Sequence, residues 1–147
     1  MTITTSVHNH RRGAMHPTVV RALGIVGATA AALAVWTVSV PLLGTQLFIR
    51  FGNSAPQPVG ITAVVSAVVV GSLAGWGVLA VMEHRVKRAR SIWTVVALGA
   101  LLASIAMPLY AAMSGSAAMT LVAMHLAVGA VVIPVFRTNR PSASQAR

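Results

Sequence analysis

The stretch from Gly75 to Thr94 constrains the fold most, because a long apolar run ends there in a burst of charge and a second apolar run begins at once. It contains the only acidic residue of the chain, followed within seven positions by four basic residues. These charged residues are Glu83, Arg85, Lys87, Arg88 and Arg90. Because loops rich in Lys and Arg face the anionic cytoplasmic leaflet, the stretch predicts the cytoplasmic turn of a membrane-embedded helical hairpin, in contact with anionic lipid headgroups.

The composition also indicates a membrane domain. Of 147 residues, 56% are apolar and only 8% are charged, which is too apolar for a water-soluble domain of this size. Apolar runs of about 20 residues flank the basic turn, so membrane spans explain its charges better than a nucleic-acid partner does. The chain has no cysteine, which excludes disulfides, thiolate chemistry and cysteine-ligated metals.

Four apolar segments are close to the length of about 20 residues that a membrane helix needs. These segments extend over residues 22–43, 59–81, 92–110 and 118–136. They predict an all-α fold, an antiparallel bundle of four transmembrane helices that forms one domain over 22–136. Polar tails are expected at 1–21 and 137–147. Either Met1 or Met15 could be the residue at which translation begins.

The distribution of basic residues predicts the orientation of the bundle. Ten of the eleven basic residues fall in the two tails or the central turn, and only Arg50 lies in the long connection between the first two spans. Because the cytoplasmic side of a membrane protein carries the excess of Lys and Arg, both termini are expected in the cytoplasm and the protein in the inner (plasma) membrane.

Small residues recur at four-residue spacing in the first two spans. Ala67, Gly71 and Gly75 form the best row, and Gly24 with Ala28 forms a second one. Such rows allow two helix backbones to approach closely, so both are predicted to lie at helix–helix contacts.

The residues around the basic turn carry two further predictions. Trp76 and Trp93 flank it and are expected to anchor the helices at the membrane interface. Glu83 and Lys87 are four residues apart in the order that favours a helical ion pair, which would extend the helix beyond the membrane surface.

His125 is the only residue among His, Lys, Arg, Asp and Glu that lies within a predicted span, and such residues are functional candidates by default. At about 1.5 Å per residue, His125 and Ser104 lie about 16 and 18 Å from the inner ends of their spans, and Ser72 about 13–14 Å. We therefore predict that His125 bonds the Ser104 hydroxyl, or the carbonyl freed by Pro108, as a structural link. A proton-relay or ligand site and an axial haem ligand are the alternatives, although no other span supplies a second histidine.

No catalytic constellation is found in the sequence. A single acidic residue cannot form a carboxylate pair, and there is no Asp or Cys for a nucleophilic triad, so only a Ser–His dyad stays formally open. No phosphate-binding loop of the usual pattern occurs. We therefore expect no enzyme activity, no catalytic residues, no metal and no cofactor.

Two groups of residues resemble an uncharacterised family of small four-span membrane proteins from actinobacteria, catalogued as a domain of unknown function. The similarity extends over roughly residues 21–137. The resemblance implies an inner-membrane location and a four-helix architecture, and it supplies no reaction, ligand or partner. The residues that carry it are Gly75, Trp76, Gly77, Glu83, Arg88, Ala89, Arg90, Ile92, Trp93 and Thr94, then Met124, His125, Leu126, Ile133 and Pro134.

Three classes of function remain. A structural or accessory subunit, which packs with itself or with a partner in the membrane, needs only the small-residue rows and the basic turn, and it is the preferred hypothesis. A small proton-coupled transporter that uses His125 is the alternative. A membrane redox or enzyme subunit is the third.

Overall fold

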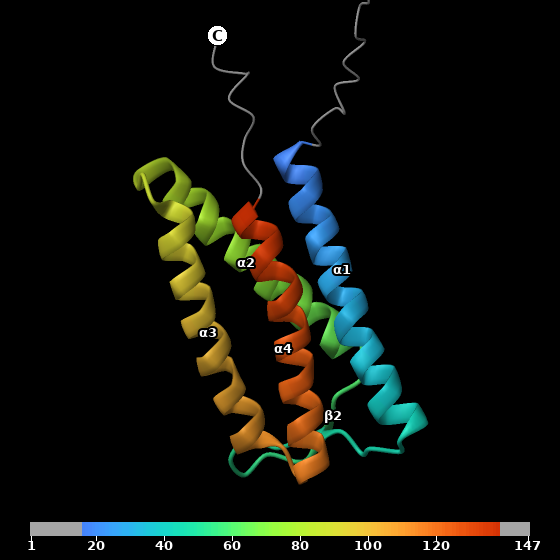
Figure 1. The fold of residues 1–147 in the computed structure, drawn as a ribbon. Coiled ribbons are helices and arrows are strands. Elements are labelled where there is room, and N and C mark those ends of the chain that lie inside the picture. Colours follow the sequence, from blue (N-terminus) through green and yellow to red (C-terminus); the bar gives the residue numbers. More distant parts are fainter. Residues whose placement is uncertain (1–15, 139–147) are drawn as a thin grey trace, which may run out of the picture.

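In the computed structural model, which describes residues 16–138, four long helices form a bundle (Figure 1). Each is long and apolar enough to cross a membrane, which confirms the prediction of an all-α bundle with four spans. The helices are α1 (Pro17–Thr37), α2 (Ile61–Arg85), α3 (Ala89–Ala111) and α4 (Gly115–Thr138). A short π-helix, η1 (Val38–Leu42), continues α1.

The helix ends follow from local chemistry. Pro17 occupies the first turn of α1, where its missing N–H is not needed, and the His16 ring accepts a hydrogen bond from the Thr18 amide at 3.4 Å. The other end of this helix widens around Pro41, where the Leu43 amide bonds the Val38 carbonyl five residues back, at 3.0 Å. A proline cannot complete the usual helical bond, so a wider turn accommodates it.

The connection between the first two helices closes one end of the bundle. Its short strands β1 (Phe48–Ile49) and β2 (Gln57–Pro58) pair in antiparallel register. The Arg50 amide donates to the Ala111 carbonyl at 2.8 Å, which ties the connection to the end of α3. We call this the loop end. The opposite end contains the start of α1, the α2–α3 turn and the end of α4, and we call it the basic end (Figure 1).

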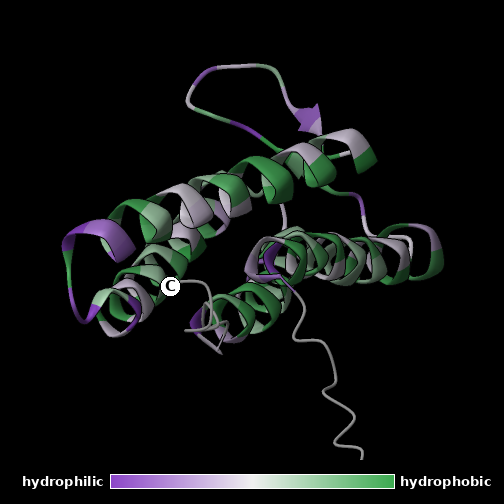
Figure 2. Ribbon diagram, turned by 90° about the horizontal axis from the view of Figure 1, so that it is seen from above, coloured by the Kyte–Doolittle hydropathy of each residue, from purple (hydrophilic) through white to green (hydrophobic). Residues whose placement is uncertain are grey.

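The four helices do not pack equally. α4 packs along both α1 and α3, whereas α2 packs across α1, meets α3, and barely touches α4. Seen from above, α2 lies apart from α4, and polar residues gather at the α2–α3 turn (Figure 2). Gly24 permits a close approach of α1 to α4, because a Cβ atom there would lie 2.7 Å from Val135 Cγ1.

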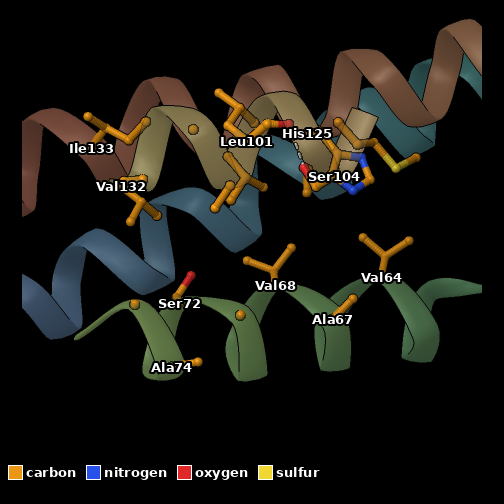
Figure 3. Close-up of a pocket in the computed structure, with 18 of the residues that line it drawn as sticks. Val64, Ala67, Val68, Ser72, Ala74, Leu101, Ser104, His125, Val132 and Ile133 are labelled. Atoms are coloured by element: carbon orange, nitrogen blue, oxygen red, sulfur yellow. Dashed lines mark hydrogen bonds between the residues drawn. The ribbon is translucent and has the colours of Figure 1, made fainter. Parts of the chain in front are cut away.

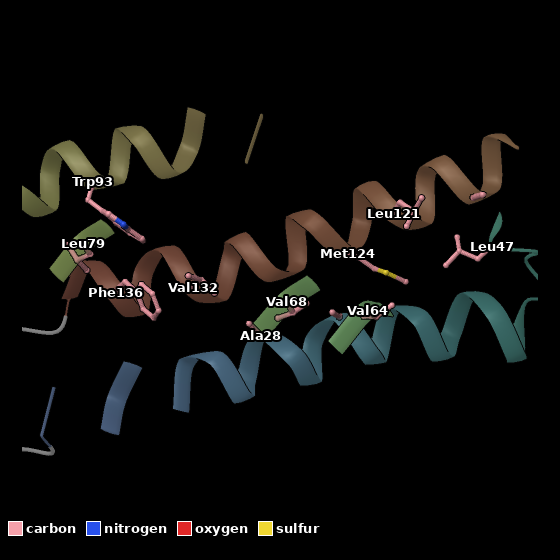
Figure 4. Close-up of a cluster of buried hydrophobic side chains, with 12 residues drawn as sticks. Ala28, Leu47, Val64, Val68, Leu79, Trp93, Leu121, Met124, Val132 and Phe136 are labelled. Carbon is pink, nitrogen blue, oxygen red and sulfur yellow. The ribbon is translucent and has the colours of Figure 1, made fainter. Parts of the chain in front are cut away.

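A buried apolar cluster runs between the helices from the basic end toward the loop end (Figure 4). Phe136 and Leu79 are fully buried near the basic end, and the Phe136 ring lies 5.6 Å from that of Trp93. Many large apolar side chains on the outer faces are exposed, as expected where lipid replaces water.

The described helices overlap the predicted spans but start or end differently. α1 begins at Pro17, so Arg21 belongs to a helix and not to the polar tail. The remainder of the predicted tails, including both candidate start residues, lies outside residues 16–138.

Candidate functional site

An apolar cleft of about 550 Å³ lies between α2 on one side and α3 with α4 on the other. We call it the lateral cleft. Along α2 it extends from Val59, just before the helix, to Val78, which corresponds to about 28 Å, nearly the hydrocarbon thickness of a bilayer. Side chains at its rim are exposed on both facing helices, including Val78 (47%) on α2 and Val96 (50%) on α3. The opening therefore lies between α2 and α3, where the lipid would be.

The small-residue row of α2 lines this cleft and does not pack against another helix of the chain. Ala67 and Gly71 are exposed, and a Cβ atom added at Gly71 would meet no atom within 4 Å. A Cβ atom at Gly75 would meet only the Trp93 ring, at 3.9 Å. The predicted helix–helix contact is therefore wrong at Gly71, because α2 diverges from α3 toward the loop end.

The small residues of α1 lie in a different environment. Ala28 is completely buried, and Gly24 faces Val135 and Phe136 of α4. Gly129 of α4 likewise allows α3 to pack closely, because a Cβ atom there would lie 2.7 Å from Leu101 Cδ2. At Gly24 and Gly129 the absence of a side chain therefore allows neighbouring helices of the bundle to pack closely.

His125 and Ser104 both line the lateral cleft, but the predicted bond between them is wrong. His125 Nδ1 lies 2.7 Å from the Leu121 carbonyl oxygen of its own helix. The Ser104 hydroxyl donates to the Leu101 carbonyl at 2.7 Å, also within its own helix. Carbonyls three or four residues back are always within reach of such side chains, so local bonds compete with bonds between helices.

Ser72 lies on the opposite wall of the cleft. Its side chain points from α2 toward the helices that carry His125 and Ser104 (Figure 3). The residue is 4% exposed, and its hydroxyl oxygen is buried without a hydrogen-bond partner among the described residues. Three polar side chains thus line a cleft that is otherwise apolar, but Ser72 lies near Val132, away from His125 and Ser104 along the cleft (Figure 3).

Trp93 closes the cleft near the basic end. Its indole N–H donates to the Gly75 carbonyl at 2.9 Å, and only 3% of the residue is exposed. The side chain therefore joins α3 to α2, and the prediction that it anchors the protein at the membrane interface is wrong. Trp76 is half-buried against the apolar cluster, and an anchoring role for it stays a prediction.

The basic end holds an ion-pair network that links three helices. Arg21 of α1 donates from Nη2 to both carboxylate oxygens of Glu83, at 2.8 and 2.9 Å, and Arg90 Nε donates to Oε1 at 3.2 Å. The predicted pair of Glu83 with Lys87 is not the one formed, because α2 ends at Arg85 and Lys87 lies in the turn. Glu83 therefore compensates an arginine that is 5% exposed.

Sequence reasoning missed Arg21 because it was counted with the polar tail. The sequence did carry a signal: Arg21 directly precedes the first predicted span, and Glu83 lies two residues beyond the end of the second. In an antiparallel pair of spans both residues are therefore expected near the same end of the bundle. Because the chain has a single acidic residue, an arginine at that depth was its natural partner.

The other predicted residues of the basic turn, Arg85, Lys87 and Arg88, are exposed. Lys87 and Arg88 line a hollow at the basic end together with Arg21 and Arg90, whereas Arg85 does not line it. Their contact with anionic headgroups stays a prediction.

The lateral cleft can hold an apolar body and a few hydrogen bonds. His125 is the only titratable residue that lines it, so it presents no pair of groups for acid–base chemistry. Within residues 16–138 no three His, Cys, Asp or Glu residues lie close enough to hold a metal ion.

Comparison with known proteins gives one match. A family model described as a family of unknown function (DUF6069) matches residues 13–142. Neither the curated proteins nor the solved structures contain a significant match.

Proposed function

Because the chain belongs to this family of unknown function, its role has to be inferred from its own geometry, and we propose that it is an accessory subunit of a membrane-protein assembly. In this proposal the lateral cleft receives a transmembrane helix of a partner protein. The chain is a multi-pass membrane protein, so the partner reaches the cleft from within the bilayer.

The open small-residue row of α2 carries the proposal. Rows of small residues favour helix association in membranes because they allow backbones to approach and pack by van der Waals contact. Ala67 and Gly71 face the cleft without a helix of their own chain against them. A cleft about as long as the hydrocarbon layer is thick matches one face of a helix that spans it.

The orientation is part of the proposal, with the basic end in the cytoplasm and the protein in the inner membrane. It is supported by the ten-to-one distribution of basic residues between the two sides. In a chain without native cysteine, a single cysteine at Asn53 should react with an impermeant thiol reagent added outside intact cells. A cysteine at Arg88 should react only after the membrane is opened, and the reverse pattern would refute the orientation.

Photo-crosslinking in the native membrane tests the accessory role. A benzophenone amino acid is placed at Val78, which lines the cleft, or at Val70, an exposed valine of the same helix outside the lining. We expect a discrete adduct only from Val78, and its crosslinked peptide should lie in a transmembrane segment of another protein.

A glycine pair provides the matched control. Gly71 and Gly77 both lie in α2 with no atom within 4 Å of an added Cβ, but only Gly71 lines the cleft. Gly71→Leu should abolish the Val78 adduct, whereas Gly77→Leu should preserve it. Equal adducts from Val78 and Val70, or none from either, would reject the accessory role.

The proton-coupled transporter is a second candidate, favoured by one observation. His125 lines the cleft about halfway along α4, where an ionisable group would be needed. Proton-dependent flux in liposomes that is lost in His125→Phe would support it.

A further inference from the structure

The hollow at the basic end is lined mainly by positive charge. It has a volume of about 690 Å³, which is within the range of ligand sites, and lies between Arg21 of α1 and the α2–α3 turn. Four Lys and Arg residues line it against one acidic residue, so the lining has an excess of three positive charges. The four are Arg21, Lys87, Arg88 and Arg90, and the acidic residue is Glu83. We call this site the basic hollow.

The buried part of the lining lacks a full set of counter-charges. Arg21 and Arg90 share the single carboxylate of Glu83, at 2.8 and 3.2 Å, so the network keeps one positive charge. Arg21 is 5% exposed, and its Nε has no hydrogen-bond partner among the described residues. Because a buried charge without full compensation is costly, the network favours a second anion close by.

The start of α3 adds donors that the described chain leaves unused. The helix begins at Ala89 without a side-chain cap and without an acidic residue in its first turn. The main-chain amides of Arg90 and Ser91 donate to no acceptor within residues 16–138, and both residues line the basic hollow. The N-terminus of a helix carries a partial positive charge and directs its free amides outward, so an anion is favoured there.

Lys87 and Arg88 line the basic hollow from the solvent side. Both are exposed, and neither forms an ion pair among the described residues. An arginine fork can donate two parallel N–H bonds to a phosphate, and a lysine supplies a compact charge. The side chains and the helix start therefore offer donors to the same kind of ligand.

We propose that the basic hollow binds one phosphate group. Lys87, Arg88 and the free amides of α3 would donate to its oxygens. Arg21, whose Nε is covered by the chain, would be compensated through charge and not through direct contact. A phosphate supplies both the negative charge and the acceptors that this lining calls for. The inference does not depend on the accessory role, because the basic hollow and the lateral cleft share no lining residue.

The neighbours of the basic hollow favour a phospholipid as the source of the phosphate. Ala80 lines the hollow, and the next residue of α2, Val81, is exposed. On α3 the exposed Ile92 directly follows the lining residue Ser91. Lipid would cover such apolar side chains, so a headgroup could enter the hollow while its acyl chains stay in the bilayer. Free phosphate is the other source with the same chemistry.

Mass spectrometry of the intact protein in detergent micelles tests the site by counting bound lipids. The probe is phosphatidylglycerol, and the control lipid is diacylglycerol, which lacks the phosphate. We expect one saturable phosphatidylglycerol per chain and no saturable diacylglycerol. Lys87→Gln and Arg88→Gln should each raise the Kd about tenfold, as for a lost hydrogen bond to a charged group.

Arg85 provides the matched control, because it is exposed in the same stretch but does not line the basic hollow. Arg85→Gln removes the same charge and should raise the Kd no more than about twofold in physiological salt, which screens an exposed charge. A rise in Arg85→Gln as large as in the two lining variants would show charge attraction without a defined site and would overturn the inference. Unchanged binding in both lining variants, or no saturable phosphatidylglycerol, would do the same.

Competition with inorganic phosphate identifies the source, with chloride at equal ionic strength as the reference. Displacement of phosphatidylglycerol would show that the site also takes free phosphate, whereas its retention would assign the site to the lipid headgroup. Both results support a phosphate site. Thermal unfolding of each variant checks the fold, which Lys87→Gln and Arg88→Gln should preserve because both residues are exposed and without ion pairs among the described residues.

Discussion

The α1–α4 contact and the lateral cleft both contain rows of small residues, but another helix of the chain covers the row at the contact and none covers the row in the cleft. At the contact, Gly24 faces α4, and a Cβ atom on Gly24 would come within 2.7 Å of Val135. Ala28, four residues further along α1, is completely buried. In the cleft, Ala67 and Gly71 have the same four-residue spacing, and nothing lies within 4 Å of a Cβ atom on Gly71.

The difference shows what a small-residue row means in a membrane. It marks a strip of backbone that can be approached closely, and it does not say which helix makes the approach. In this chain one row is used within the bundle. The other is left open, which is why we assign it to a partner.

The largest expected effect comes from filling the packed row. Gly24→Leu would force the α1 and α4 backbones apart, because the added side chain meets Val135 and Phe136 at once. We expect the free energy of unfolding to fall by about 3 kcal/mol, the upper part of the usual range for overpacking. Unfolding by a denaturing detergent in mixed micelles measures it, and an unchanged value would mean that α1 does not pack this closely.

A smaller effect is expected at the basic end, where an ion pair supplements the close packing. Glu83→Gln keeps the shape of the side chain but leaves the charge of Arg21 buried without compensation. Breaking such a pair usually costs several kcal/mol, and we expect about 2 kcal/mol because Arg21 lies near the membrane surface. Arg85→Gln, at an exposed residue of the same helix, is the control. Equal stabilities of the two variants would show that the network does not hold the helices together.

The smallest effect is expected from filling the open row. Gly71→Leu should change the free energy of unfolding of the isolated protein by less than about 0.5 kcal/mol, as for substitutions that touch nothing. Gly77→Leu controls for the change in helix propensity. A loss as large as that of Gly24→Leu would mean that the cleft closes in the membrane, and the comparison on which the accessory role rests would fail.

Several side-chain positions could not have been predicted from spacing alone. His125 and Ser104 lie at matching depths and line one cleft, yet each bonds a carbonyl of its own helix. Depth specifies only one of the three coordinates of a side chain, and the rotation of each helix decides the rest. Trp93 is buried for the same reason, since its helix turns the indole toward Gly75.

The sequence by itself determined that this protein has four membrane helices, because hydrocarbon demands apolar side chains and a backbone whose hydrogen bonds are satisfied within each span. It also determined that the single acidic residue lies in a basic turn. Only the tertiary structure decided which small residues are covered, that Arg21 is the partner of Glu83, and that Ser72 and His125 face one cleft. Lipid is as apolar as the helix surfaces, so hydropathy cannot distinguish a face covered by protein from one covered by lipid, and packing alone makes that choice.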